Sequence, residues 1–231
     1  MNPRRHPAKK RAFTLVELLT VVSIIALLAS FSVPAMQALF RSGGVNQAAG
    51  DLSGILECAR SYAMSQNTYV RVGLACVSGG SNASVPTLVA IAISSVDGSL
   101  TYDSASDMAD NTRWKPLTRP LILGNVWTYD TLNATTAPDT RNDSLPSGTD
   151  IPAFSRPAGR MGAVTFTSIV QFAPSGEAQV LKAESARYIK IGLDQPRQPN
   201  APESARNENP FVLRLAGING RIDILRKENL N

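Results

Sequence analysis

Apolar residues dominate the chain from Phe13 to Phe40, where Glu17 is the only ionisable side chain. From Leu18 to Val33 nearly every residue is Leu, Val, Ile, Ala, Phe or Ser. About 20 such residues, at a rise of roughly 1.5 Å each, span the hydrocarbon core of a bilayer. The pattern therefore predicts a transmembrane helix over residues 13–35.

The apolar pattern changes to a one-sided stripe over residues 36–66, which predicts that the helix continues. Apolar residues recur there at spacings typical of an amphipathic α-helix. They are Val45, Ala48, Ala49, Leu52, Ile55, Leu56, Ala59, Tyr62 and Ala63. Glycines interrupt the stripe, and each weakens a helix by up to about 1 kcal/mol relative to Ala. We expect a break near Gly43-Gly44, either as a hinge or for close helix packing.

Residues 67–231 have the pattern of a β-rich head. Apolar runs predict strands at 69–74, 88–93, 121–127, 163–172, 187–193, 211–215 and 221–225. Turns are predicted near Asn67, at Pro174-Ser-Gly176 and at Gly217-Ile-Asn-Gly220, where the Asn-Gly pair permits positive φ in a hairpin. Short strands behind one helix predict an α+β fold, with an antiparallel sheet packed on the long N-terminal helix.

Two long segments, 129–162 and 194–210, are polar and rich in turn-forming residues. Loops of such length are usually functional or disordered. We interpret both as tolerated surface insertions. The alternative is that they form a surface for a partner protein.

The distribution of charge predicts the topology. The stub before Phe13 carries Arg4, Arg5, Lys9, Lys10 and Arg11 and no acid. Such a stub stays in the cytoplasm, so the C-terminal bulk of the chain faces outward. Of the 23 basic residues five lie in this stub, which leaves 18 against 18 acidic residues. The basic balance of the whole chain therefore gives no reason to expect a nucleic-acid partner.

The segment Arg11-Ala-Phe-Thr-Leu-Val-Glu17, with its basic stub and apolar continuation, resembles the class III leader of type IV prepilins and type II secretion pseudopilins. The resemblance implies that residues 1–12 are a cytoplasmic leader, that prepilin peptidase cuts between Ala12 and Phe13, and that the new amine of Phe13 is methylated. It also implies a single-pass inner-membrane protein with a periplasmic head. Its partners would be the inner-membrane assembly platform and other pilins or pseudopilins. Ala12 replaces the usual Gly, so we expect slower cleavage.

Glu17 is the one acid expected at membrane depth. A carboxylate there costs a few kcal/mol and is normally retained with a partner. Cleavage after Ala12 would create a cationic amine at Phe13, four residues earlier and on the same helix face. The resemblance implies that Glu17 pairs with this amine on a neighbouring subunit during assembly. The alternative is an ordinary membrane anchor with one isolated acid.

Pro34 follows Phe13 by 21 residues, where many pilins also carry a proline. Proline removes a helical hydrogen bond and clashes with the preceding turn, so we expect a kink at Pro34. The alternative is that Pro34 marks the membrane exit. A conventional secretory signal cut near Ala35 is disfavoured by the long apolar core and by Glu17 at its start.

Three later phrases resemble the GspH/FimT group of minor pilins and pseudopilins. They are Ala59-Arg-Ser61 followed by Val70-Arg-Val72, then Phe172-Ala-Pro-Ser-Gly176, then the Gly220-Arg221 hairpin. The resemblance implies a structural subunit of a type II secretion pseudopilus or a type IV pilus. The sequence leaves open which of these machines it serves.

DNA capture by a minor pilin is the main alternative function. FimT-like proteins that bind DNA carry a C-terminal Gly-Arg-x-Arg motif, but this chain has Gly220-Arg-Ile-Asp223. The basic side chains left to contact phosphates are Arg214, Arg221, Arg226 and Lys227. Because Asp223 and Glu228 offset them, we do not expect nucleic acid as a partner. A membrane-anchored periplasmic binding domain is the second alternative.

The sequence does not favour an enzyme. The only histidine, His6, lies in the leader, so the mature chain has no residue for Ser-His-Asp or Cys-His chemistry. It contains no phosphate loop or nucleotide fingerprint, and we expect no cofactor. Four loop acids, Asp97, Asp103, Asp107 and Asp110, are spaced unlike an EF-hand. We interpret them as solvated acids and expect no metal.

The two cysteines, Cys58 and Cys76, lie outside the predicted membrane segment, where a disulfide can form. Cys58 is expected on the helix and Cys76 at the far end of the following strand. Helix and strand rise differ about twofold per residue, which places the pair out of register. We therefore expect two buried thiols rather than a bridge.

Overall fold

The computed structural model describes residues 15–78, 86–124, 126–128, 151–180, 188–194 and 211–226, with backbone only for residues 29–43, 78, 86, 127, 128, 194 and 226. The chain divides into two compact units, Met1–Ser42 and Gly43–Asn231. The expected leader at 1–12, and most of the two polar segments (129–150 and 195–210), lie outside the described residues.

Helix α1 comprises Leu15–Gln66. Its backbone is helical through Pro34 and also through Gly43-Gly44, so the expected break in the helix is wrong. The hinge remains a prediction, and the boundary between the two compact units lies between Ser42 and Gly43. A glycine costs a helix only about 1 kcal/mol, which the packing of neighbouring residues offsets. The predicted end of the helix is confirmed, because Asn67 has a φ of 50° and Thr68 N donates to Ala63 O at 3.1 Å. This is the Schellman arrangement of a helix C-terminus.

The described residues of the second unit form two antiparallel sheets and a two-stranded ribbon. The larger sheet has the order β3-β2-β1-β8-β9, and β4 also pairs with β2. Its strands are β1 (Val70–Ser78), β2 (Pro86–Ser95), β3 (Trp114–Pro116), β4 (Leu121–Gly124), β8 (Ser168–Phe172) and β9 (Ala178–Gln179). The smaller sheet, β12-β11-β10-β5, comprises β5 (Trp127–Thr128), β10 (Tyr188–Asp194), β11 (Phe211–Ala216) and β12 (Ile222–Arg226).

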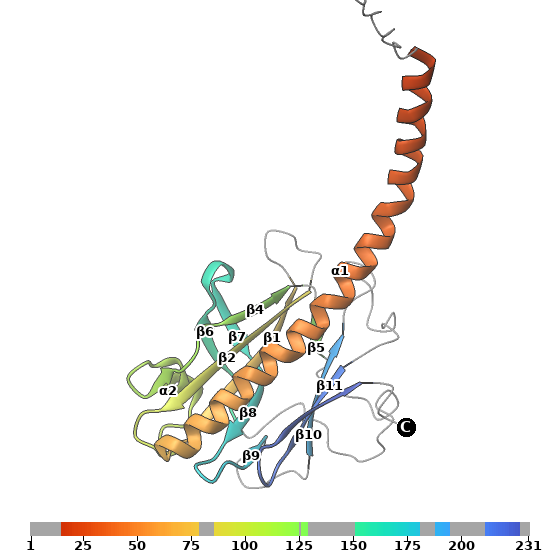
Figure 1. The fold of residues 1–231 in the computed structure, drawn as a ribbon. Helices are drawn as coiled ribbons and strands as arrows, with labels where there is room; N and C mark the ends of the chain where they lie inside the picture. The colour runs from red at the N-terminus through yellow and green to blue at the C-terminus, as the bar shows by residue number, and fades with distance from the viewer. Residues whose placement is uncertain are drawn as a thin grey trace, which may run out of the picture. The chain divides into compact units, whose positions relative to one another are not determined.

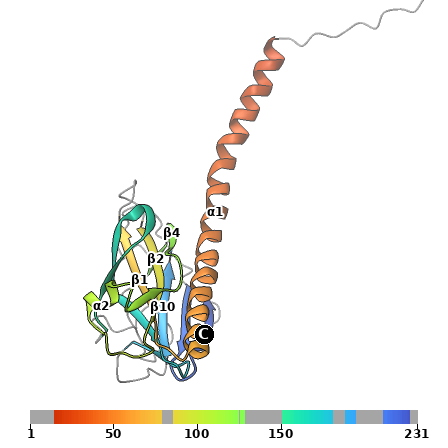
Figure 2. The same ribbon diagram turned by 90° about the vertical axis from the view of Figure 1, so that its left-hand side faces the viewer.

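The ribbon pairs β6 (Phe154–Pro157) with β7 (Ala163–Phe166), and the 3₁₀ helix η1 (Gly159–Met161) lies between them. A short helix, α2 (Ala105–Ala109), follows β2. Figure 2 shows the second half of α1 on one side of β1 and β2, with α2 on the other side. The larger sheet is therefore the middle layer of this unit.

Two clusters of buried side chains hold these layers together. The first joins the stripe of α1 to both sheets; Leu52 and Leu56 are fully buried there with Val72 and Leu213. The second covers the other face of the larger sheet, where Trp114 packs with ribbon residues. The stripe predicted from the sequence thus faces the core. Figure 1 shows the second half of α1 running along the strands of the head. An N-terminal helix followed by antiparallel sheets confirms the α+β class.

Several predicted strands need correction because they change partner. Residues 121–127 form β4 and β5 in different sheets, and residues 163–172 form β7 in the ribbon and β8 in the larger sheet. Apolar runs predict extended backbone but not the partner of each strand. Part of the expected polar loop is also ordered, because Ile151 and Phe154 are 1% exposed in the second cluster.

Both predicted turns after the first strand are confirmed. The turn at Gly176, with a φ of 87°, joins β8 to β9, and its N–H donates to Ala173 O at 2.8 Å. The hairpin of β11 and β12 closes at Gly220, with a φ of 62°, whose N–H donates to Ala216 O at 2.7 Å. Positive φ is the conformation for which glycine has no steric penalty.

Candidate functional site

The first half of α1 exposes apolar side chains in every direction. Between Leu15 and Leu28, the ten large apolar side chains are 48% to 80% exposed. The two hydroxyls of this segment bond to the helix backbone: Thr20 Oγ1 donates to Glu17 O at 2.9 Å, and Ser23 Oγ donates to Leu19 O at 2.8 Å. A helix that is apolar all round normally lies in lipid or inside a larger assembly.

Glu17 lies in the first turn of α1. It is the only ionisable residue from Leu15 to Leu28. A carboxylate in the first turn also suits the helix dipole. Ala12 and Phe13 lie outside the described residues, and Pro34 falls where only backbone is described, so its expected kink remains a prediction.

Within the described part of the chain, no helix combines the length and apolar character needed to cross a membrane. The expected span at 13–35 includes residues 13 and 14 and the side chains of residues 29–35, which lie outside the described set.

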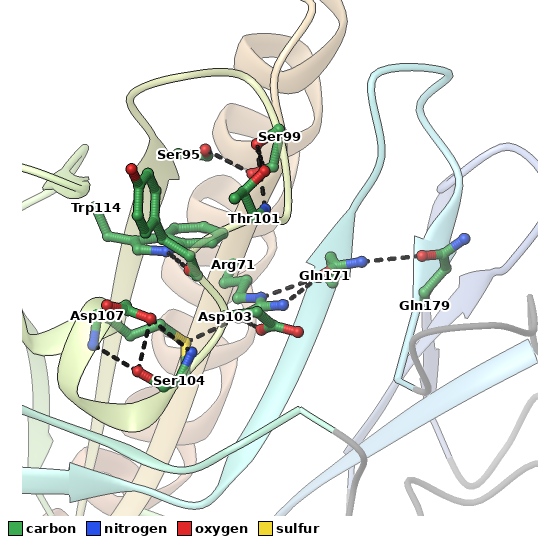
Figure 3. Close-up of polar contacts among 12 residues, drawn as sticks. Arg71, Ser95, Ser99, Thr101, Asp103, Ser104, Asp107, Trp114, Gln171 and Gln179 are labelled. Atoms are coloured by element: carbon green, nitrogen blue, oxygen red, sulfur yellow. Dashed lines mark hydrogen bonds and ion pairs between the residues drawn. The ribbon is translucent and has the colours of Figure 1, made fainter.

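A fully buried arginine lies on β1 in the second unit (Figure 3). Arg71 Nε and Nη2 donate to Gln171 Oε1 at 2.9 and 2.8 Å, and Gln171 Nε2 donates to Gln179 Oε1 at 3.0 Å. Arg71 Nη1 pairs with Asp103 Oδ1 at 2.6 Å, and the guanidinium lies 4.7 Å from the centre of the Trp114 ring. Burial lowers the pKa of Arg71, while Asp103 acts in the opposite direction.

The sequence analysis did not predict this hydrogen-bond network around Arg71. Val70, Val72 and Leu74 face α1, so strand alternation directs Arg71 to the other face. Helix α2 and the ribbon cover that face. A charge in such a place requires partners, and Asp103 supplies the opposite charge.

The expectation of four solvated acids is therefore wrong for two of them. Asp103 pairs with buried Arg71, and Asp107 forms a capping box with Ser104 and pairs with Arg113. Asp97 is exposed, and hydrogen bonds from Ser95 and Ser99 lower its pKa. Among the described residues, no group of three or more metal-ligating side chains could hold an ion.

The C-terminal basic residues are engaged within the chain. Arg214 Nη2 lies 3.2 Å and Arg221 Nε lies 3.1 Å from oxygens of Asp223. The acid that replaces the second basic residue of the DNA motif thus binds both arginines. The side chain of Arg226 and all of Lys227 lie outside the described residues.

Cys58 and Cys76 form no disulfide in the structure. Cys76, on β1, is partly buried, but Cys58 is exposed on α1. The expectation that both thiols are buried is therefore wrong. Cys58 lies between the stripe residues Leu56 and Ala59 in sequence, but helical periodicity turns it to the outer face.

A comparison with protein families matched residues 7–33 to the prokaryotic N-terminal methylation motif. No curated protein and no solved structure gave a significant match. The matched segment contains Ala12, Phe13 and Glu17. The motif is a type IV pilin-like prepilin signal, which implies processing by prepilin peptidase and membrane anchoring before assembly with other pilins. The match thus supports the pilin and pseudopilin family, whose members are structural, and indicates a type IV pilin-like processed subunit.

Proposed function

We propose that the chain is a minor pilin or pseudopilin of the GspH/FimT type, built into a type II secretion pseudopilus or a type IV pilus. The observation that carries this proposal is the uncovered apolar surface from Leu15 to Leu28, inside the matched motif. Apolar surface of this extent is stable in lipid or against other helices. The inner membrane provides lipid before assembly, and the core of the filament provides other helices afterwards.

Processing prepares the helix to move from the membrane into the filament. Cleavage between Ala12 and Phe13 removes the cytoplasmic leader 1–12, and the new amine of Phe13 is methylated. Residues 13–35 hold the subunit in the inner membrane with the head in the periplasm. In the filament, the Glu17 carboxylate pairs with the Phe13 amine of a neighbouring subunit, which offsets the cost of a charge in an apolar environment.

The first experiment determines the N-terminus of the native protein by mass spectrometry. We expect a methylated Phe13 at the start of the mature chain, and a chain that keeps its leader in a strain without prepilin peptidase. An intact Met1 in normal cells, or a start near Ala35, would exclude this processing and with it the proposed role.

The second experiment tests Glu17. The Glu17→Val variant should insert and be cleaved normally, because valine is less costly in lipid than a carboxylate, but it should be absent from sheared filaments. Glu57→Val is the matched control, because Glu57 is exposed on the second half of the same helix. Normal recovery of the Glu17→Val protein in filaments would contradict the pairing.

A strain in which the gene is deleted distinguishes a type II secretion pseudopilus from a type IV pilus, because the two would lose different processes. Loss of protein export with pili intact assigns the subunit to a type II secretion pseudopilus. Loss of surface pili with export intact assigns it to a type IV pilus. DNA capture is not proposed, because Arg214 and Arg221 are both paired with Asp223.

A further inference from the structure

A polar cavity of about 380 Å³ lies in the second unit, where the last turn of α1 meets the end of β2. Its walls include Tyr62 and Gln66 of α1, Asn67 just after it, and Lys115 of β3. Ligand pockets generally measure about 300–1,000 Å³, so this one suits a small molecule or a single side chain.

One side of the cavity is formed by polar groups that already bond to one another. Thr68 Oγ1 donates to Ser95 O at 2.9 Å, and Ser95 Oγ donates to Asp97 Oδ1 at 2.7 Å. Asp97 also accepts hydrogen bonds from the backbone N–H and the hydroxyl of Ser99. These bonds hold the side of the cavity rigid and leave Asp97 with little remaining capacity to accept.

The other side is formed by polar groups without such bonds. Within the described residues, the side chains of Tyr62, Gln66, Asn67 and Lys115 make no hydrogen bond or ion pair. Four different donor groups thus line one cavity. The Lys115 ammonium is the charged group among these four.

Strand alternation places Lys115 in this position. Trp114 is fully buried on the face of the larger sheet that is turned away from α1. Its neighbour Lys115 therefore lies on the face that is turned towards α1. Lys115 is directly opposite Ser94 in the pairing of β2 with β3, and Ser94 also lines the cavity. The ammonium group therefore extends beside the end of α1.

The edge of the cavity is fixed by two tight turns in contact. Asn67 is the only described non-glycine residue with positive φ, at 50°, and Gly98 has a φ of 73°. A Cβ added to Gly98 would lie 3.4 Å from Asn67 O, so the two backbones touch. This contact fixes the backbone of Asn67 at the edge of the cavity.

We propose that this cavity binds a carboxylate on a small hydrogen-bonding ligand of about amino-acid size. Lys115 supplies the charge partner, and Tyr62, Gln66 and Asn67 supply hydrogen bonds to the rest of the ligand. Asp97 nearby disfavours a second negative charge, so the ligand is a monocarboxylate. The source is either a free molecule or an acidic side chain of a peptide. The proposal does not depend on N-terminal processing or on filament assembly.

Isothermal titration calorimetry of the full-length protein in detergent micelles tests this proposal. N-acetylglycine supplies a carboxylate and an amide, and N-acetylglycinamide is its neutral counterpart. We expect the carboxylate to bind about tenfold or more tightly than the amide, because hydrogen bonds to charged groups are the stronger ones. Equal affinity for both probes, or no heat from either at about 20 mM, would overturn the proposal.

A third probe, acetyl-Gly-Asp-Gly-amide, carries its carboxylate on a peptide side chain. Binding tighter than that of N-acetylglycine assigns the source to a peptide, and weaker binding assigns it to a free molecule. Either result supports a carboxylate site, whereas a response equal to that of its Asn counterpart, acetyl-Gly-Asn-Gly-amide, contradicts one.

Variants identify the charge partner. Lys115→Met should weaken N-acetylglycine binding about tenfold or more, and Lys115→Arg should restore most of it. Arg119→Met is the matched control, because Arg119 is exposed just after β3 and does not line the cavity. Both lysine variants should keep the wild-type circular dichroism, since Lys115 is exposed. Unchanged affinity in Lys115→Met would refute the site.

Discussion

In residues 43–66 of α1 the apolar side chains lie on one face, whereas in residues 15–28 they lie on every face. Leu52 and Leu56 are fully buried against the two sheets. Leu18 and Leu19, on the same helix, are 62% and 59% exposed. Burying a leucine side chain is worth about 1.5–3 kcal/mol, so the second half of α1 draws its stability from its own chain.

The first half has no comparable source of stability among the described residues. Its helical hydrogen bonds are satisfied internally, and its hydroxyls donate to its own backbone. What it lacks is a medium that accepts apolar side chains. The difference teaches that one helix can pack into the core of a folded head along one half and expose apolar side chains along the other.

The largest expected effect separates the two halves directly. Leu56→Ala should lower the free energy of unfolding by about 4 kcal/mol, because it leaves a cavity in a fully packed core. Leu19→Ala should change it by less than about 0.5 kcal/mol, because Leu19 touches no core. Urea unfolding of the full-length protein in detergent, followed by the fluorescence of Trp114 and Trp127, measures both. Equal effects would invalidate the comparison.

A charge substitution sharpens the comparison. Asp103→Ala should cost about 3 kcal/mol of unfolding free energy, because buried Arg71 loses its counter-charge. Glu17→Ala should leave the unfolding of the head unchanged, since Glu17 lies in the other unit. The same unfolding assay checks this. As a control, Asp223→Ala should cost less than about 1 kcal/mol, because its pairs are partly exposed. A cost as large as that of Asp103→Ala would argue against burial as the cause.

Glycine substitutions give smaller effects of opposite sign. Gly220→Ala should cost about 2 kcal/mol, because its φ is 62° and an added Cβ would clash with Gly176 O. Gly50→Ala should instead stabilise the head by up to about 1 kcal/mol, because a Cβ there meets no atom within 4 Å. Thermal unfolding by circular dichroism distinguishes the two. A loss of stability in Gly50→Ala would mean that the face of α1 that carries Gly50 packs against other residues.

The smallest expected effect is that of acid on the head. Hydrogen bonds from Ser95 and Ser99 lower the pKa of Asp97, so its contribution is present above the ordinary value of about 3.9 and is lost as the pH falls below it. The contribution is less than about 1 kcal/mol, because Asp97 is exposed. Asp97→Asn should flatten the decline in unfolding free energy below about pH 4. A decline that is identical in the variant would assign the acid sensitivity to other groups.

The sequence by itself determined the elements that depend on local chemistry. The period of the apolar stripe predicts which face of α1 is buried. Pro174-Ser-Gly176 predicts a turn, and the Asn-Gly pair that ends at Gly220 predicts a hairpin in which positive φ is permitted. The sequence also predicts the environment of the first half of α1, because apolar side chains on every face of a helix indicate surroundings other than water. These properties are set by residues within a few positions of one another.

Only the tertiary structure decided which surfaces meet. Arg71 and Gln171 are 100 positions apart, and no local pattern indicates that they hydrogen-bond or that a second layer buries them. The split of residues 163–172 between two sheets, and the cavity beside Lys115, also arise from the pairing of distant strands. Strand partners are chosen by the packing of the whole head, because an extended segment can form hydrogen bonds with any strand that the core brings beside it.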